Sequence, residues 1–207
     1  MKWNAAGVYH ELMKAQLLVA VLVCGNVVVH AQTQPPASWL DKPFVIWNKA
    51  GASVPMAPLT RANRDRILAT CTESLLTSTP AERALSDAGW IPFLNFDQKI
   101  EQGDIEIVGG MAGVDGMCRP TGYNLFVFAG GRFAGTLSPV PMISRTDASS
   151  GAVRIIGPEN ISAEFVRYTE KDALCCPSSR VTVRFRINRL SAPVVAPTEL
   201  RTTRSTK

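Results

Sequence analysis

The chain has 207 residues, of which 46% are hydrophobic, and its formal net charge at pH 7 is +5. This length and apolar content suffice for one domain with a substantial core and are small for two. The positive charge is too low for the basic footprint of a nucleic-acid-binding protein, so we expect no nucleic-acid partner.

The first segment, residues 1–31, has the pattern of a secretory signal peptide. An apolar run at residues 15–29 follows Lys14, and the sequence V-H-A ending at Ala31 suits signal peptidase. The run is too short to span a membrane comfortably. We therefore expect cleavage before Gln32, export to the periplasm or the extracellular space, and no transmembrane span in the mature chain.

Lipid attachment at Cys24 is the alternative processing of this segment. A lipobox has Gly, Ala or Ser directly before the cysteine, whereas this chain has the bulky Val23 there. We therefore expect cleavage after Ala31 rather than lipid anchoring.

Removal of residues 1–31 takes away both histidines, His10 and His30. Without histidine, Ser-His-Asp and Cys-His catalysis in their usual forms and His-ligated metals are excluded. Two lysines and one glutamate leave as well, so the mature net charge becomes +4, which mildly favours anionic partners.

Residues 32–59 contain five prolines around a short apolar piece, F-V-I-W at residues 44–47. This composition predicts an extended leader that wraps the domain rather than a domain of its own.

Two helices are predicted next. Apolar residues recur at helical spacing between residues 64 and 76, which puts Cys71 on a buried stripe. The sequence T-P-A-E at residues 79–82 supplies an N-cap hydroxyl, a first-turn proline and a capping glutamate, and Gly89 supplies the stop.

After Gly89 the apolar pattern has a period of two. Strands are predicted at residues 90–96, 105–111, 123–129, 132–137, 153–156, 161–169 and 180–188. Gly130-Gly131 suits a two-residue hairpin loop. The strand L-F-V-F-A before it is apolar on both faces, which indicates that the predicted helices cover one side of the sheet.

These elements predict an α+β fold: an antiparallel meander sheet of about six or seven strands with one or two N-terminal helices packed on it. The single domain would span residues 60–188. Residues 189–207 lack a period and end in basic residues, so we expect a disordered basic tail.

Four cysteines remain in the mature chain: Cys71, Cys118, Cys175 and Cys176. An even number in an exported protein predicts two structural disulfides. Adjacent Cα atoms lie about 3.8 Å apart, closer than in ordinary disulfides. Pro177 also favours an extended Cys176, from which neighbouring side chains point to opposite sides. We therefore expect Cys175 and Cys176 each to bond one of Cys71 and Cys118, in an order that the sequence leaves open.

A reactive role for Cys175 and Cys176 is less favoured. The chain has no CxxC pair, and adjacent cysteines chelate a metal poorly, so we expect no metal and no cofactor. A thiol oxidoreductase that uses this pair is the third functional hypothesis.

Acidic residues carry the second hypothesis, a carboxylate-dependent hydrolase. Asp104 and Glu106 would share one face of a strand, and Asp115 lies in the turn G-V-D-G-M. Paired carboxylates serve glycosidases. The commoner interpretation is that these residues are solvated strand edges and turn formers, and the same holds for Asp147.

Candidate ligand contacts lie in the irregular, glycine-containing segments, where binding sites tend to form. They are Asp115, Arg119, Tyr123, Arg145 and Asp147. A row of strand arginines, at positions 154, 167, 180, 184 and 186, is a candidate anion-binding stripe, although such residues more often shield sheet edges.

Three stretches resemble the LppP/LprE lipoprotein family of exported bacterial proteins: D-G-M-C-R-P at residues 115–120, the hairpin and following loop at residues 125–147, and D-A-L-C-C-P-S at residues 172–178. The likeness covers roughly residues 80–188. It implies an exported, disulfide-bearing domain and carries over no reaction and no catalytic residue. The first hypothesis is therefore a non-catalytic, monomeric domain that binds an envelope or extracellular partner through loops 110–122 and 138–151.

Overall fold

The structure is a computed structural model that describes residues 38–71, 79–93, 100–144, 146–173 and 175–204. The predicted signal peptide and Cys24 lie outside these residues. No helix in the described part of the chain is long and apolar enough to cross a membrane.

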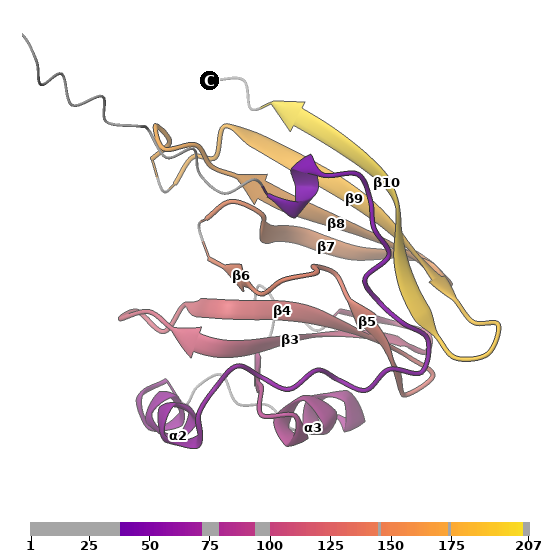
Figure 1. The fold of residues 1–207 in the computed structure, drawn as a ribbon, viewed down its shortest axis with the longest axis horizontal. Coiled ribbons are helices and arrows are strands. Elements are labelled where there is room, and N and C mark those ends of the chain that lie inside the picture. The colour runs from indigo at the N-terminus through magenta and orange to yellow at the C-terminus, as the bar shows by residue number, and fades with distance from the viewer. Residues whose placement is uncertain (1–37, 72–78, 94–99, 145, 174, 205–207) are drawn as a thin grey trace, which may run out of the picture. The chain divides into compact units, whose positions relative to one another are not determined.

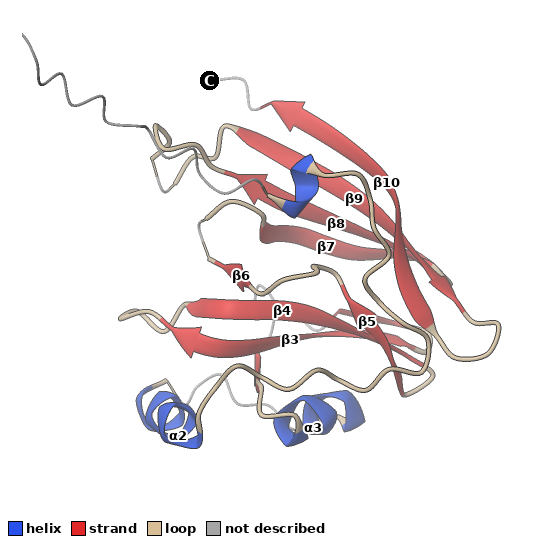
Figure 2. Ribbon diagram, viewed as in Figure 1, coloured by secondary structure: helices blue, strands red, loops and turns tan. Residues whose placement is uncertain are grey.

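Ten strands, two α-helices and one 3-10 helix make up the described chain (Figures 1 and 2). The helices are η1 Trp39–Asp41, α2 Arg61–Thr70 and α3 Pro80–Asp87; the strands are β1 Ile91–Phe93, β2 Ile100–Gln102, β3 Ile105–Val114, β4 Pro120–Ala129, β5 Arg132–Thr136, β6 Met142–Ile143, β7 Ser149–Gly157, β8 Asn160–Arg167, β9 Ser179–Asn188 and β10 Val194–Arg204. The predicted α+β class is confirmed.

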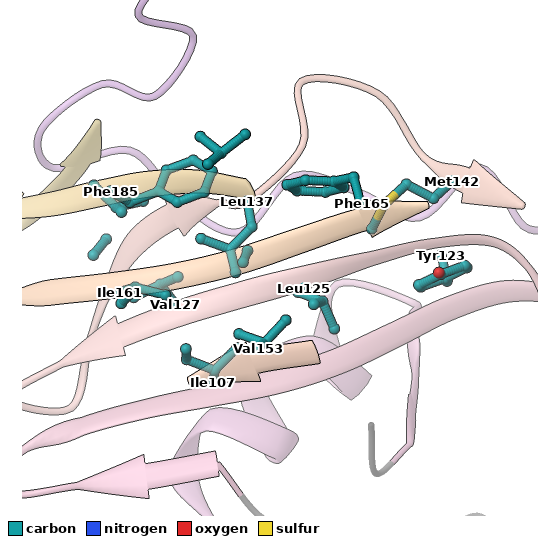
Figure 3. Packing of buried hydrophobic residues seen from close by; sticks show 14 of the residues in the cluster. Ile107, Tyr123, Leu125, Val127, Leu137, Met142, Val153, Ile161, Phe165 and Phe185 are labelled. Carbon is teal, nitrogen blue, oxygen red and sulfur yellow. The ribbon is translucent and has the colours of Figure 1, made fainter. Parts of the chain in front are cut away.

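The strands form two antiparallel sheets rather than one. The first has the order β1-β3-β4-β5, with β2 also paired to β3 and β6 to β4, and the second has the order β10-β9-β8-β7. Pro139 and Pro141 lie in the segment between β5 and β6, and β6 is the last strand of the first sheet before the chain enters the second sheet at β7. Leu125 and Val127 of the first sheet and Phe165 and Phe185 of the second belong to one apolar cluster between the sheets (Figure 3).

The first sheet is also covered on its other face, as the sequence of β4 predicts. Phe126 of β4 and Leu85 of α3 are both fully buried, and they belong to a second apolar cluster. Gly110 permits this contact, because a Cβ added there would lie 2.8 Å from the Phe126 ring and 2.9 Å from Leu85 Cδ2. Trp90 stacks edge-on against Phe126 and donates a 2.7 Å hydrogen bond to the carbonyl of Pro55 in the leader.

Helix α3 begins as predicted. Thr79 accepts a hydrogen bond from the Glu82 amide, while the Glu82 carboxylate accepts one from the Thr79 amide, which completes a capping box. Helix α2 ends at Thr70, before the predicted residue 76, and Cys71 is its buried C-cap. The remainder of that predicted helix, residues 72–76, lies outside the described chain.

The leader runs along one side of both sheets, from β8 past the edges of β10 and β5 (Figure 1). Asn48 donates from its side-chain amide to the carbonyls of Thr136 and Val195, at 2.9 Å each. Trp47 Nε1 donates to the Thr136 carbonyl at 3.1 Å. These bonds join the leader to an edge strand of each sheet.

The expectation of a disordered tail was wrong for residues 194–204. They form β10, paired along β9 from Val194 opposite Asn188 to Arg204 opposite Ser179. The register shifts between Pro197 and Glu199, and this bulge interrupts the alternation of side chains that would have identified a strand. Val195 is fully buried, and Leu200 packs on the same cluster.

Candidate functional site

The tip of the β3–β4 hairpin is bonded covalently to the end of α2. Cys71 forms a disulfide with Cys118, and their Cα atoms lie 5.7 Å apart. Asp115 shapes the tip, because its Oδ1 accepts hydrogen bonds from the Met117 amide at 2.8 Å and the Arg119 amide at 3.0 Å. Arg119 Nε also pairs with Asp115 Oδ2 at 2.5 Å. Although desolvation opposes it, these bonds hold the pKa of Asp115 below its usual value.

A groove of about 350 Å³ lies between α2 and this hairpin, and both bonded cysteines line it. Helix α2 contributes Asn63, Arg66 and Thr70 to its wall, and Ile67 and Val114 add apolar surface. Strand β1 pairs with β3 only as far as Met111. Residues 112–114 therefore have β4 on one side and, among the described residues, no strand on the other.

The predicted loop 110–122 supplies the hairpin side of this groove, which Asp115 and Cys118 line. Arg119 lies beside it through its ion pair with Asp115. Met117 at the tip is 73% exposed. The second predicted binding segment, residues 138–151, is not among the groove's lining residues.

The structure pairs the cysteines differently from the prediction: Cys175 is bonded to Cys176, whose Cα lies 3.8 Å away, and both are exposed. The prediction assumed an extended chain there. Instead the Cys176 amide donates to the Ala173 carbonyl at 2.8 Å, so the segment is a turn. This turn lies between β8 and β9 of the second sheet, whereas Cys71 and Cys118 belong to α2 and a hairpin of the first.

Thiol–disulfide exchange requires a bond that an attacking thiolate can reach, and the exposed Cys175–Cys176 bond meets this requirement. The pair lies in a turn between β8 and β9 and not at the N-terminus of α2 or α3, the position at which reactive cysteines are commonly found. The oxidoreductase hypothesis stays a prediction.

Asp172 organises the turn that carries this pair. Its Oδ2 accepts hydrogen bonds from the amides of Ser178 and Thr169, at 3.0 and 2.7 Å, and bonds from these two residues lower the pKa of Asp172 to about 2. Because the folded pKa is depressed, the charged form supports the turn above the unfolded value of about 3.9 and loses that role as pH falls through about 2.

We therefore expect the backbone amide resonances of Thr169 and Ser178 to stay constant from neutral pH down to about 3 and to shift with a midpoint near the lowered pKa. The Asp172→Asn variant should show displaced resonances at every pH and no such midpoint. A wild-type midpoint at about 3.9, the ordinary aspartate value, would contradict the assignment.

Two other predicted ligand residues have structural roles. Tyr123 is 4% exposed; its hydroxyl accepts a 2.9 Å hydrogen bond from the Ser150 amide and thereby joins β4 to β7. Burial raises its pKa. Asp147 pairs with Arg167, which also binds Asp41 in η1 at 3.0 Å. The fifth candidate, Arg145, lies outside the described residues.

The three acids of the hydrolase hypothesis do not meet in one site. Asp104 forms a two-point ion pair with Arg189 at 2.7 and 2.9 Å, and this hydrogen bonding lowers its pKa. Glu106 accepts a 2.7 Å hydrogen bond from the Thr79 hydroxyl at the start of α3. Asp115 directly follows the opposite end of β3. Since a strand rises by about 3.3 Å per residue, Asp115 lies roughly 30 Å from Glu106.

The structure instead brings Glu82 and Glu106 together around Thr79, which sequence reasoning missed because these residues come from separate elements. Glu82 is 3% exposed and serves the helix cap, so the arrangement is explained by capping.

Most arginines of the predicted stripe are paired with carboxylates. Arg180 pairs with Glu164, Arg184 with Glu199 at 3.5 Å, and Arg186 with Glu159 at 3.6 Å. A second hollow of about 710 Å³, at the turn between β9 and β10, is lined by Arg186 and Arg189, each already bonded to an acid. The arginine stripe and this hollow therefore have fewer unpaired positive charges for an anionic ligand than the sequence suggests. In addition, no group of three metal-ligating side chains occurs among the described residues.

Residues 105–189 match the family model described as LppP/LprE lipoprotein. The LppP/LprE match runs from β3 to β9 and confirms the resemblance, although it starts after α3 rather than at residue 80. No curated protein and no solved structure matches the chain.

The LppP/LprE match indicates an exported, envelope-associated protein. Since lipoproteins typically carry a lipid anchor, the match does not support the expectation that Cys24 remains unmodified. The matched residues include Cys118 and the Cys175–Cys176 pair but not Cys71.

Proposed function

We propose that the protein is a non-catalytic, envelope-associated domain that binds an extended segment of a partner protein in the groove between α2 and the β3–β4 hairpin. The observation that carries this proposal is the Cys71–Cys118 bond, because both cysteines line the groove and the bond holds its two walls together. A groove that is rigid before binding loses less conformational entropy when a partner is ordered in it.

The groove has the features that recognise an extended chain. One side of β3 at residues 112–114 has no strand partner among the described residues, which suits addition of a partner strand. Asn63 and Thr70 offer polar groups to a peptide backbone, and Ile67 and Val114 offer apolar contacts to alternate side chains. The LppP/LprE match supports a location at the envelope, in the periplasm or outside the cell.

Filling the groove tests the proposal. An added Cβ at Gly116 meets no atom within 4 Å, so Gly116→Trp should fold normally while its ring obstructs the groove. We expect this variant to lose at least about tenfold in the amount of partner that it captures from an envelope extract after cross-linking. The matched control is Leu190→Trp, since Leu190 is 94% exposed on the β9–β10 turn and is not a groove residue.

Capture of the same partner by Gly116→Trp and by the wild-type protein would overturn the groove as the binding site. Capture of no specific partner by the wild-type protein would count against the function itself.

A further inference from the structure

Three consecutive apolar side chains project from the leader. Phe44, Val45 and Ile46 are 37%, 70% and 68% exposed, and we call these three residues the ridge. The next residue, Trp47, is fixed to β5 by its hydrogen bond to Thr136 and packs edge-on against Trp39. The ridge is therefore held at one end by the folded domain, while Val45 and Ile46 remain largely exposed and Phe44 remains partly exposed.

The exposure pattern favours a lipid surface over a partner strand. A strand that pairs with another chain buries alternate side chains on one face. Here the adjacent Val45 and Ile46 are exposed to the same degree. At the boundary between lipid headgroups and acyl chains, neighbouring apolar side chains can be buried together, because this burial requires no backbone hydrogen bonds to a partner strand.

Charge around the ridge points to anionic lipid. Lys42 and Lys49 flank it, both are exposed, and neither forms an ion pair with any residue that the structure describes. A lysine near an anionic membrane surface strengthens binding by about fivefold. Four of the seven arginines on the second sheet, in contrast, are paired with glutamates: Arg180, Arg184, Arg186 and Arg201.

The position of the ridge in the sequence also favours contact with a lipid surface. The described residues begin at Ser38, only a few positions before Lys42. The residues that precede them include Cys24 and the apolar run at 15–29, the part of the sequence with features for membrane targeting. The ridge is therefore the first apolar surface of the folded domain after the segment that carries those features.

We propose that the ridge and its two flanking lysines form a contact site for an anionic lipid bilayer, which seats the domain on the membrane surface. This site is separate from the groove, and the inference does not depend on partner binding there.

Vesicle binding tests the inference. The full chain is exported and purified with the substitution Cys24→Ala, so that no lipid anchor contributes, and its N-terminus is verified by mass. Co-sedimentation is measured with vesicles of phosphatidylcholine alone and with vesicles that also contain phosphatidylglycerol. We expect binding to the anionic vesicles, and about tenfold weaker partitioning for the Val45→Ser/Ile46→Ser variant, because it removes apolar burial.

Two further variants separate charge from apolar contact. Lys42→Gln/Lys49→Gln should weaken binding to the anionic vesicles by about tenfold or more and should change binding to the neutral ones little. Leu190→Ser, which removes a side chain of similar size and greater exposure on the β9–β10 turn, should bind as the parent does. Circular dichroism checks that each variant is folded.

Equal binding by Val45→Ser/Ile46→Ser and the parent would overturn the inference, and so would an equal loss with Leu190→Ser. A ridge variant that keeps vesicle binding but loses capture of an envelope protein would show that the ridge contacts protein instead. Gly116→Trp should bind vesicles normally, so failure of the groove proposal and failure of this one are distinguishable.

Discussion

Replacement of Cys71 and Cys118 by alanine is expected to lower the free energy of unfolding by about 4 kcal/mol on the chain-entropy model. The bond joins residues that are 47 positions apart, so it removes much conformational freedom from the unfolded chain. It also holds the C-terminal end of α2 against the hairpin tip. Urea unfolding followed by circular dichroism measures the change, and capture of the groove partner should fall in the same variant.

The second cysteine pair supplies the control for this experiment. Cys175 and Cys176 are one residue apart, so breaking their bond releases no long loop. We expect Cys175→Ala/Cys176→Ala to cost less than about 1 kcal/mol. Equal losses of stability in the two double variants would contradict the pairing of Cys71 with Cys118, because in the alternative pairing each double variant would break both long-range bonds.

The substitution Phe126→Ala is expected to lower the free energy of unfolding by about 3–5 kcal/mol, as is typical when a buried phenylalanine is truncated. Phe126 is 0% exposed and lies between β4 and helix α3. Its ring centroid is 5.0 Å from that of Trp90, which in turn bonds the leader. A cavity here would therefore weaken the packing of helix, sheet and leader together.

Phe133→Ala is the matched control, because the Phe133 ring lies 6.2 Å from that of Phe126 but is only partly buried at the edge strand β5. Solvent can fill the space it leaves, so we expect a loss of about half as much or less. Urea unfolding of both variants gives the comparison. A Phe126→Ala loss no larger than that of Phe133→Ala would show that the interface between α3 and the sheet contributes little to stability.

Local signals in the sequence were sufficient for several elements. The capping box at Thr79 predicted the start of α3, and Gly130 and Gly131, with φ of 57° and 71°, form the predicted hairpin turn. The apolar β4 predicted cover on both faces of its sheet, which α3 and the second sheet provide. Each of these features depends on residues close together in the chain, so their physical causes are visible in the sequence.

The candidate site was predicted only in part. The loop at residues 110–122 does line the groove, yet the groove also needs Asn63 and Ile67 from α2. Nothing in the sequence shows that α2 lies beside the tip of a hairpin nearly fifty residues later. The sequence shows the ridge as part of an apolar segment of the leader. Only the exposed fractions of its side chains in the structure show that the fold leaves this segment exposed.

By itself, the sequence determined the α+β class, the start of α3, the central strand and the resemblance to the LppP/LprE family, because these follow from residue spacing and short motifs. Tertiary structure alone decided the division into two sheets, the pairing of Cys71 with Cys118 and the formation of strand β10 by residues 194–204. The physical reason is that these features arise from contacts between distant segments, and a bulge or a turn at one position changes which segments meet.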